Sequence, residues 1–178
     1  MTSLADAQAG IRDLHARYCD ATFRKDYDAF ADCFAEDAEW RISGRVFRGP
    51  AEVRQGIATI MDKFNRVFIT FRNPILTVGE GVASGRTWLD ERCAWKNGDT
   101  HIAIGLYYEH FARAGDRWLF KWRMFETHYR GPPDMSGTFF DLTDYGAPPA
   151  MPPLDIMTAD MASKRWGLPA AGEASGGE

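Results

Sequence analysis

The sequence predicts an α+β fold in which helices come first and an antiparallel β-sheet follows, with the helices on one face of the sheet. Two observations support this fold class. The N-terminal third contains three stretches with helical periodicity, and from Val67 onward apolar and polar residues alternate in long runs separated by turn residues. At 178 residues, the chain is most simply one domain with an extension.

The three predicted helices have recognisable apolar stripes and start signals. Residues 8–24 carry one stripe, formed by Ile11, Leu14, Tyr18 and Thr22. Asp26 is suited to cap a second helix, whose apolar positions are Phe30, Cys33 and Phe34. Pro50 suits the first turn of a third helix, whose apolar positions are Val53, Ile57, Ile60, Met61 and Phe64.

The predicted strands follow from alternation and from the turns between them. Two short strands, 39–42 and 45–47, are joined through Ser43-Gly44. The later strands are expected at residues 67–71, 75–78, 82–95, 101–113 and 118–129. Asn97-Gly98 is a strong hairpin signal between two of them. The resulting meander should form one curved sheet.

Composition excludes several classes of protein. A net charge of -4, with charges of both signs interspersed, argues against nucleic acid as a partner. No run of eighteen apolar residues is present, so we expect no membrane span. The N-terminus lacks a basic segment followed by an apolar one, and the three cysteines lack CxxC spacing. We therefore expect a cytoplasmic protein with reduced thiols.

The aromatic content of 13% is high for a chain of this size. Six Trp, twelve Phe and six Tyr exceed what a small core needs, which favours an aromatic-lined cavity or an oligomer interface. We expect a homo-oligomer, either a dimer or a trimer.

The composition changes after Gly131-Pro132-Pro133, which divides the chain into residues 1–130 and an extension, 131–178. Six of the nine prolines lie between residues 131 and 153, and one short helix is expected at 155–166. The extension carries apolar residues unusual for a solvated tail: Phe139, Phe140, Leu142, Tyr145, Leu154 and Trp166. We interpret it as a lid over the cavity or as a contact with a partner subunit.

Residues 8–130 resemble the SnoaL-like branch of the NTF2-like superfamily. The resemblance rests on the order of several weak motifs: Ile11-x-x-Leu14-x-x-x-Tyr18, the Asp26 turn, Phe34 to Glu39, Phe47-x-Gly49, Asn73, Gly105 to Glu109, and Asp116-Arg117-Trp118. It implies a cone-shaped domain, in which a curved antiparallel or mixed sheet wraps around the N-terminal helices and encloses one pocket. The superfamily holds dehydratases, isomerases, lyases, dioxygenase small subunits and proteins without catalysis, so the fold alone does not imply an activity.

The dehydratases of this superfamily use Tyr, Asp and His around the pocket, without a metal. The resemblance places the tyrosine at Tyr18, but the aspartate falls on Phe23, which cannot transfer a proton. The histidine falls near Ile69 or Thr70, so it is missing as well. An acidic position remains at Glu109. The family's usual acid–base pair is therefore broken, and Phe23 is interpreted as a wall for an aromatic ring.

Alternation along the strands supplies other candidates. The face of 101–111 that carries His101, Tyr107 and Glu109 is expected to point into the pocket, because its small residues leave room for a ligand. On the last strand, one face begins apolar and ends ionisable: Trp118, Phe120, Trp122, Met124, Glu126 and His128. Arg86 and Trp88 alternate together and could hold a phenolate or carboxylate. Trp40 and Phe47 complete the predicted substrate-binding residues. His15 is expected to flank the buried stripe.

These features predict a lyase or dehydratase that needs no cofactor and acts on an aromatic, phenolic, hydroxylated small molecule. Glu109 and His101 would form the acid–base pair, with Tyr18 and His128 as further catalytic candidates. A para-phenol supplies its own electron sink through a quinone methide, which suits loss of water and also release of formaldehyde from an aryl-propanediol. Lyases of lignin-derived diaryl compounds occur in the superfamily. No short spacing of three ligands predicts a metal site.

Two other functions stay open at this point. The chain also resembles the non-catalytic small subunit of a ring-hydroxylating dioxygenase, which only scaffolds a partner. A ketosteroid-isomerase-like enzyme is the third option, with Tyr18 and Tyr107 as donors and Glu109 as the base.

Overall fold

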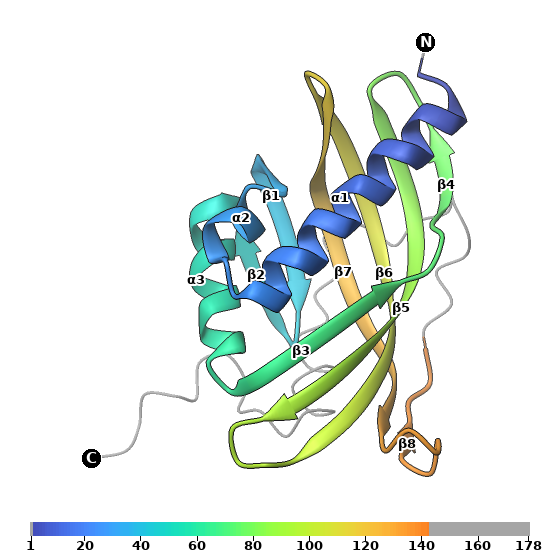
Figure 1. Ribbon diagram of the computed structural model, residues 1–178. Helices are drawn as coiled ribbons and strands as arrows, with labels where there is room; N and C mark the ends of the chain where they lie inside the picture. The colour runs from blue at the N-terminus through green and yellow to red at the C-terminus, as the bar shows by residue number, and fades with distance from the viewer. Residues whose placement is uncertain (1, 143–178) are drawn as a thin grey trace.

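The computed structural model describes residues 2–142 of the chain. In this part, helices α1 and α2 precede the sheet and α3 interrupts it after its second strand (Figure 1). The elements are α1 (Leu4–Arg24), α2 (Tyr27–Ala31), β1 (Phe34–Ile42), β2 (Arg45–Arg48), α3 (Gly49–Met61), β3 (Phe64–Phe71), β4 (Ile75–Val78), β5 (Val82–Trp95), β6 (Thr100–Ala114), β7 (Arg117–Gly131) and β8 (Thr138–Phe139).

The eight strands form one curved sheet in the order β2-β1-β7-β6-β5-β3, with β4 paired to β5 and β8 to β7. The meander from β5 to β7 is antiparallel as expected, but β1 runs parallel to β7. Since β1 comes before the meander in sequence, its direction is set by the helices around it and not by a hairpin turn. The sheet is therefore mixed, and the predicted α+β cone is confirmed.

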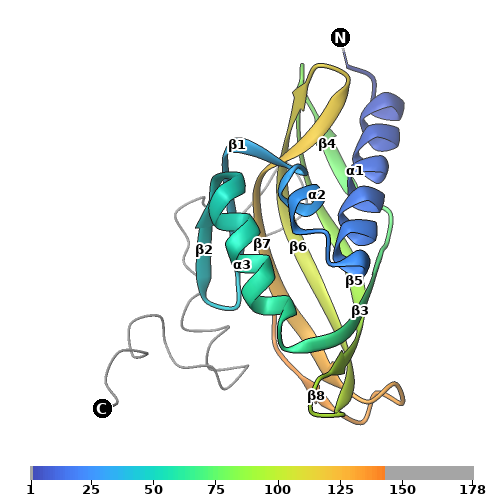
Figure 2. The same ribbon diagram turned by 60° about the vertical axis from the view of Figure 1, so that its left-hand side comes forward.

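All three helices pack on the concave side of the sheet, as the two views show (Figures 1 and 2). Helix α1 lies diagonally across β3 and β7, while α3 covers β1 and β2. Ser3 caps α1 by accepting a bond from the Asp6 backbone N–H, so the helix begins one turn earlier than predicted. Asp26 caps α2, and Pro50 lies in the first turn of α3, as the sequence predicts.

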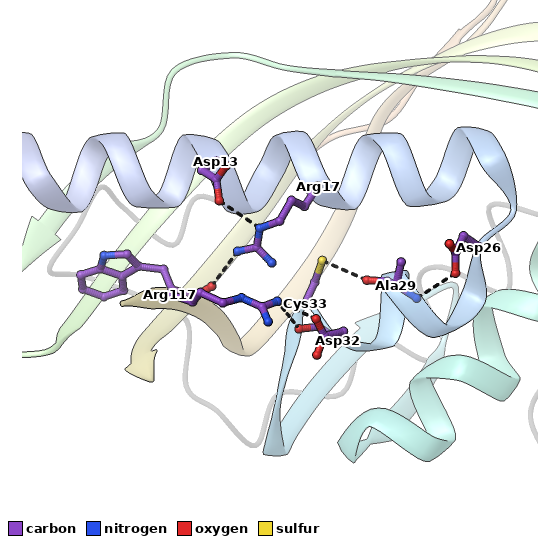
Figure 3. A network of polar contacts seen from close by, with 8 residues as sticks. Asp13, Arg17, Asp26, Ala29, Asp32, Cys33 and Arg117 are labelled. Atoms are coloured by element: carbon purple, nitrogen blue, oxygen red, sulfur yellow. Dashed lines mark hydrogen bonds and ion pairs between the residues drawn. The ribbon is translucent and has the colours of Figure 1, made fainter. Parts of the chain in front are cut away.

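A network of polar contacts anchors the helices at the turn between β6 and β7 (Figure 3). Arg17 on α1 bonds Asp13 through Nε and the carbonyl of Trp118 through Nη2. Arg117 at the start of β7 donates to both the carboxylate and the carbonyl of Asp32, which follows α2. These contacts hold α1 over the strands that carry the ionisable residues.

Two β-bulges in β7 determine which of its side chains face the helices. Phe111 pairs with Phe120, whereas the preceding residue, His110, pairs with Trp122, so Lys121 is an extra residue. A second shift, between the pairs Gly105–Thr127 and Ile104–Tyr129, makes His128 an extra residue. Each bulge reverses the alternation that a regular strand would keep.

Most of the aromatic residues serve the core between the helices and the sheet. The fully or nearly buried rings of this core include Tyr18, Phe30, Phe34, Trp40, Tyr107, Phe111 and Phe120. Several meet at centroid distances of 4.5–6 Å, for example Tyr18 and Phe30 at 4.5 Å. The three cysteines are free thiols, as predicted.

The predicted helix at 155–166 lies outside the described residues. The same holds for the proposed lid or partner contact of the extension beyond residue 142. None of the helices in residues 2–142 is long and apolar enough to cross a membrane.

Candidate functional site

One cavity of about 310 Å³ lies between the helices and the concave face of the sheet. This volume is at the lower end of the range of small-molecule sites. Its walls are mainly apolar, with a few polar and charged groups. The lining includes Tyr18, Thr22, Trp40, Arg45, Lys63, Glu91, Cys93, Trp95, Phe125 and Arg130.

Tyr18 projects from α1 and lines the cavity with its phenol ring. The Trp40 indole N–H donates to the Tyr107 hydroxyl at 3.2 Å, and the Tyr107 oxygen lies 3.5 Å from that of Tyr18. Because indole can only donate, the Tyr107 proton is free to point toward Tyr18, whose own proton can then point to a ligand. Burial raises the pKa of Tyr18 well above its usual value, although the charge of Arg123 opposes this. Tyr18 is therefore a neutral hydrogen-bond donor at physiological pH.

Glu109 lies behind these tyrosines in a fully buried cluster. Its carboxylate accepts bonds from Thr87 Oγ1 at 2.7 Å and His15 Nε2 at 3.2 Å, and it pairs with Arg123 Nη2 at 2.8 Å. Burial alone would raise the pKa of Glu109, but the charges of His15 and Arg123 and these bonds outweigh burial and lower it. The carboxylate is therefore ionised, and its oxygens are occupied by neighbours.

Arg123 is buried among aromatic rings. Its guanidinium carbon lies 3.6 Å from the ring centroid of Tyr107, 3.9 Å from that of Phe120 and 4.6 Å from that of Tyr18. Such contacts with ring faces stabilise a desolvated cation. The Glu109–Arg123 pair thus places a positive charge directly behind the two hydroxyl-bearing rings.

Among the described residues that line the cavity, Glu91 is the one with a carboxyl group. It projects from β5 on the concave face, opposite Ala103 of β6. Burial raises the pKa of Glu91 to about 7, with Arg123 opposing the shift. An acid with this pKa exists in both protonation states near neutral pH, which is the property a general base or acid requires.

Cys93, two residues further along β5, also lines the cavity. Burial raises the pKa of this thiol strongly. It stays protonated at neutral pH, so it contributes an apolar wall and not a nucleophile.

Phe23 does not line the cavity, which corrects its interpretation as a ring-binding wall. Its side chain is 43% exposed and packs against Phe68 on β3 at 4.6 Å. Five residues after Tyr18, a helical side chain is rotated by about 140° from the buried stripe, because successive residues turn by about 100°. Thr22, four residues after Tyr18, lines the cavity instead.

The last strand also requires a correction. Trp118 and Phe120 face the helices as predicted, but the bulge at Lys121 turns Trp122 and Glu126 to the opposite face. His128, at the second bulge, lies with its ring edge toward Trp88 and Phe139 on that opposite face. None of these residues lines the cavity.

Arg86 and Trp88 share a face, as the alternation predicts, but it is the convex one. Arg86 pairs with Tyr108, and Trp88 with Leu106, both of which point away from the helices. The residues of β5 that point inward are Thr87, Leu89, Glu91 and Cys93, one position out of phase with the predicted pair.

His101 and Phe47 lie beside the cavity. The His101 Nδ1 accepts a 2.8 Å bond from the Trp95 indole, and burial lowers its pKa to about 4, so the ring is neutral. Phe47 packs against Trp40 and over Gly56, where a Cβ atom would collide with its ring. Both residues position a neighbour that lines the cavity.

Sequence reasoning missed Glu91, Arg123 and the role of His15. His15 is buried, stacks on Phe71 at 4.3 Å and bonds Glu109, so it does not flank the stripe at the surface. The inward phase of β5 could have identified Glu91, since the strand bounds 82–95 were predicted as the structure has them. No sequence pattern indicated that Arg123 is buried, because the face of β7 to which its side chain points depends on the bulge at Lys121.

Residues 2–142 contain no group of three His, Cys, Asp or Glu side chains placed to hold a metal ion. The chemistry available in the described cavity is thus that of a carboxyl group, a phenol hydroxyl and nearby cations.

The helices packed on the concave face of a curved mixed sheet define the chain as a protein with the NTF2-like fold. This agrees with solved structures. A hexachlorocyclohexane dehydrochlorinase (LinA, type 2) superposes with a TM-score of 0.67 at 17% identity, covering 80% of this chain and 99% of that chain. A scytalone dehydratase-like protein from Novosphingobium aromaticivorans DSM 12444 gives 0.65 at 17% identity, covering 76% and 88%.

A protein of unknown function from Mycobacterium tuberculosis gives a TM-score of 0.62 at 25% identity, covering 67% of this chain and 74% of that chain. Residues 3–124, more than half of the chain, match the SnoaL-like domain family. The chain therefore belongs to the SnoaL-like family. No curated protein sequence matches it significantly.

Proposed function

We propose that this protein is a lyase that needs no cofactor and acts on a hydroxylated aromatic small molecule held in the cavity. The observation that carries the proposal is Glu91, a carboxyl group with a pKa near 7 in an apolar, aromatic cavity that also contains the Tyr18 hydroxyl. Two of the similar structures carry the names of lyases, a dehydrochlorinase and a scytalone dehydratase-like protein, which supports the reaction class.

In this proposal, ionised Glu91 removes a proton from the substrate as general base. Tyr18 donates a hydrogen bond to the group that departs, such as a hydroxide leaving as water. Arg123 stays behind the phenol rings and favours the negative charge that develops near Tyr18. The sequence predicted Glu109 and His101 as the acid–base pair, but in this scheme neither transfers a proton. Glu109 forms an ion pair with Arg123, and His101 accepts a hydrogen bond from Trp95.

A para-phenolic diaryl-propanediol is the finer substrate that we propose. Loss of the benzylic hydroxyl as water, driven by the phenol oxygen, forms a quinone methide. Glu91 then takes the proton of the primary hydroxyl, the adjacent C–C bond breaks, and formaldehyde leaves. The electron pair of that bond returns to the ring and restores the phenol, so the products are a stilbene, water and formaldehyde.

The direct test is turnover of a synthetic para-hydroxylated 1,2-diarylpropane-1,3-diol by the purified full-length protein without added metal. We expect stilbene absorbance and formaldehyde to appear in equal amounts. A panel of simpler phenolic alcohols tests dehydration alone. If no member of either set is converted, the lyase proposal is wrong.

Replacing Tyr18 with Phe should reduce kcat by about a hundredfold, because a donor aimed at developing charge is removed. The ring and its packing on Phe30 stay in place, so the fold should be retained. Thr22→Val, one helical turn further and also at the cavity, is the control and should keep most activity. Equal rates for Tyr18→Phe and the unaltered protein would exclude Tyr18 as the donor.

The pH dependence of kcat/KM should follow the ionisation of Glu91. Because the base must be deprotonated and burial places its pKa at about 7, activity should rise by about tenfold between about pH 6 and about pH 8. Stopped assays across this range would show it. A profile that falls with increasing pH would mean that the working group is an acid.

The same two residues also fit an isomerase that moves a proton next to a carbonyl group. Tyr18, backed by Tyr107, would bind the carbonyl oxygen, and Glu91 would move the proton. Incubation with a β,γ-unsaturated ketone separates the two functions, since only an isomerase would produce the conjugated ketone.

A further inference from the structure

The charged residues of the cavity lining are mostly cations. Arg45, Lys63 and Arg130 accompany a single carboxyl group, that of Glu91. The three cations come from distant parts of the sequence: the start of β2, the turn between α3 and β3, and the end of β7. The fold therefore concentrates positive charge at one cavity in a chain whose net charge is -4.

Arg45 and Lys63 are the two exposed cations of this set, and neither forms an ion pair with a described residue. Many surface arginines and lysines are paired with a carboxylate, such as Arg54 with Asp28 and Lys96 with Asp62. Within residues 2–142, the side chains of Arg45 and Lys63 bond no other residue. Their charge is thus available to a ligand in the cavity.

The local backbone holds Arg45 at this position. Ser43 and Gly44 form the two-residue turn between β1 and β2, with φ values of 51° and 72°. Both positive values are those of a hairpin turn that matches the twist of the strands. Arg45 follows directly and pairs with Ile42 across the hairpin. Arg130 is held by a contact of its guanidinium with the Trp95 ring at 5.4 Å.

We propose that Arg45, Lys63 and Arg130 bind a carboxylate group on the aromatic substrate, so that the substrate class is arene-containing acids. The ring would lie against the apolar and aromatic walls, among them Trp40 and Phe125, while the carboxylate stays near the cations. Arginine and lysine both bind carboxylates by charge-assisted hydrogen bonds. This inference rests on the cavity of the proposed function, and it specifies the ligand of that cavity independently of turnover.

Binding of matched probes tests this proposal. Titration calorimetry would compare 3-(4-hydroxyphenyl)propanoate with its uncharged amide, using the full-length protein. We expect the acid to bind at least about tenfold more tightly than the amide, and the preference to weaken as salt increases. Equal binding of acid and amide, or binding of neither, would overturn the proposal.

Variants show whether these cations cause the preference. Arg45→Gln/Lys63→Gln should reduce it to less than about threefold, whereas Arg45→Lys/Lys63→Arg should keep it. Lys96→Gln is the control, because Lys96 is also exposed but pairs with Asp62 and does not line the cavity. A preference unchanged in the double Gln variant would place the carboxylate elsewhere and overturn the assignment.

The result is distinguishable from failure of the lyase proposal. If the acid binds preferentially but no phenolic diol or alcohol is converted, the carboxylate site stands and the lyase function is wrong. If neutral diols are converted and the acid shows no preference, the lyase stands and the carboxylate site is wrong. Replacing the carboxylate of the probe with a phosphate ester tests whether the cations prefer the planar anion.

Discussion

Arg123→Met should destabilise the protein by about 3–5 kcal/mol, because it leaves the buried Glu109 carboxylate without its cation. Both side chains of this pair are completely buried, so water cannot replace the lost partner. For a chain of this size, the loss corresponds to a decrease in Tm of about 6–20 °C. Urea unfolding followed by circular dichroism would measure the change in free energy.

Two comparisons test the cause of this destabilisation. The double variant Arg123→Met/Glu109→Gln should recover at least about 1 kcal/mol, because an amide keeps hydrogen-bonding capacity toward Thr87 and His15 without a buried charge. Arg54→Met removes an exposed partner of Asp28 and should leave the unfolding midpoint nearly unchanged. A double variant less stable than the single one would show that the charge of Glu109 is not the reason.

Glu91→Gln should reduce kcat by between about a hundredfold and about ten-thousandfold, since it removes the proposed base and keeps its shape. The residual activity of this variant should no longer rise with pH around pH 7, because glutamine does not ionise. Between the ordinary Glu pKa of 4.5 and the raised pKa of about 7, the unfolded state releases this proton while the folded state keeps it, so the unaltered protein loses stability as pH rises through this range. The variant should therefore unfold at the same or a higher temperature above neutral pH.

Asp90→Asn is the matched control for this experiment. Asp90 is the preceding residue of β5, points to the opposite face and pairs with Arg72 at 2.9 Å. Its loss should change turnover less than about twofold. Comparable losses in both variants would indicate damage to the strand, and full activity of Glu91→Gln would exclude Glu91 as the base.

Local sequence patterns were sufficient for the elements and for much of their order. Asp26 capping α2, Pro50 opening α3 and the Asn97-Gly98 hairpin are local effects of backbone geometry, so they can be recognised without the tertiary structure. The inward face of β6 with Tyr107 and Glu109 also followed from alternation. The parallel pairing of β1 with β7 did not, because no hairpin joins these strands.

The residues at the cavity were predicted less completely, for a specific physical reason. Tyr18 and Trp40 were placed correctly at the cavity, since helical and strand periodicity bury them. Trp122, Glu126 and His128 were assigned to the wrong face because one inserted residue at a bulge reverses the side chains that follow it, up to the next bulge. Arg86 and Trp88 were also assigned to the wrong face, because on β5 the alternate residues, such as Thr87 and Leu89, point inward.

The sequence by itself determined the α+β class, the helix caps, the long strands and the family, because these depend on local periodicity and on the order of motifs. Only the tertiary structure decided that Glu109 is occupied by Arg123 and His15, and that Glu91 faces the cavity near Tyr18. Burial and charge at these positions come from strands and helices distant in sequence, so the chemical state of each carboxyl group is a property of the folded chain.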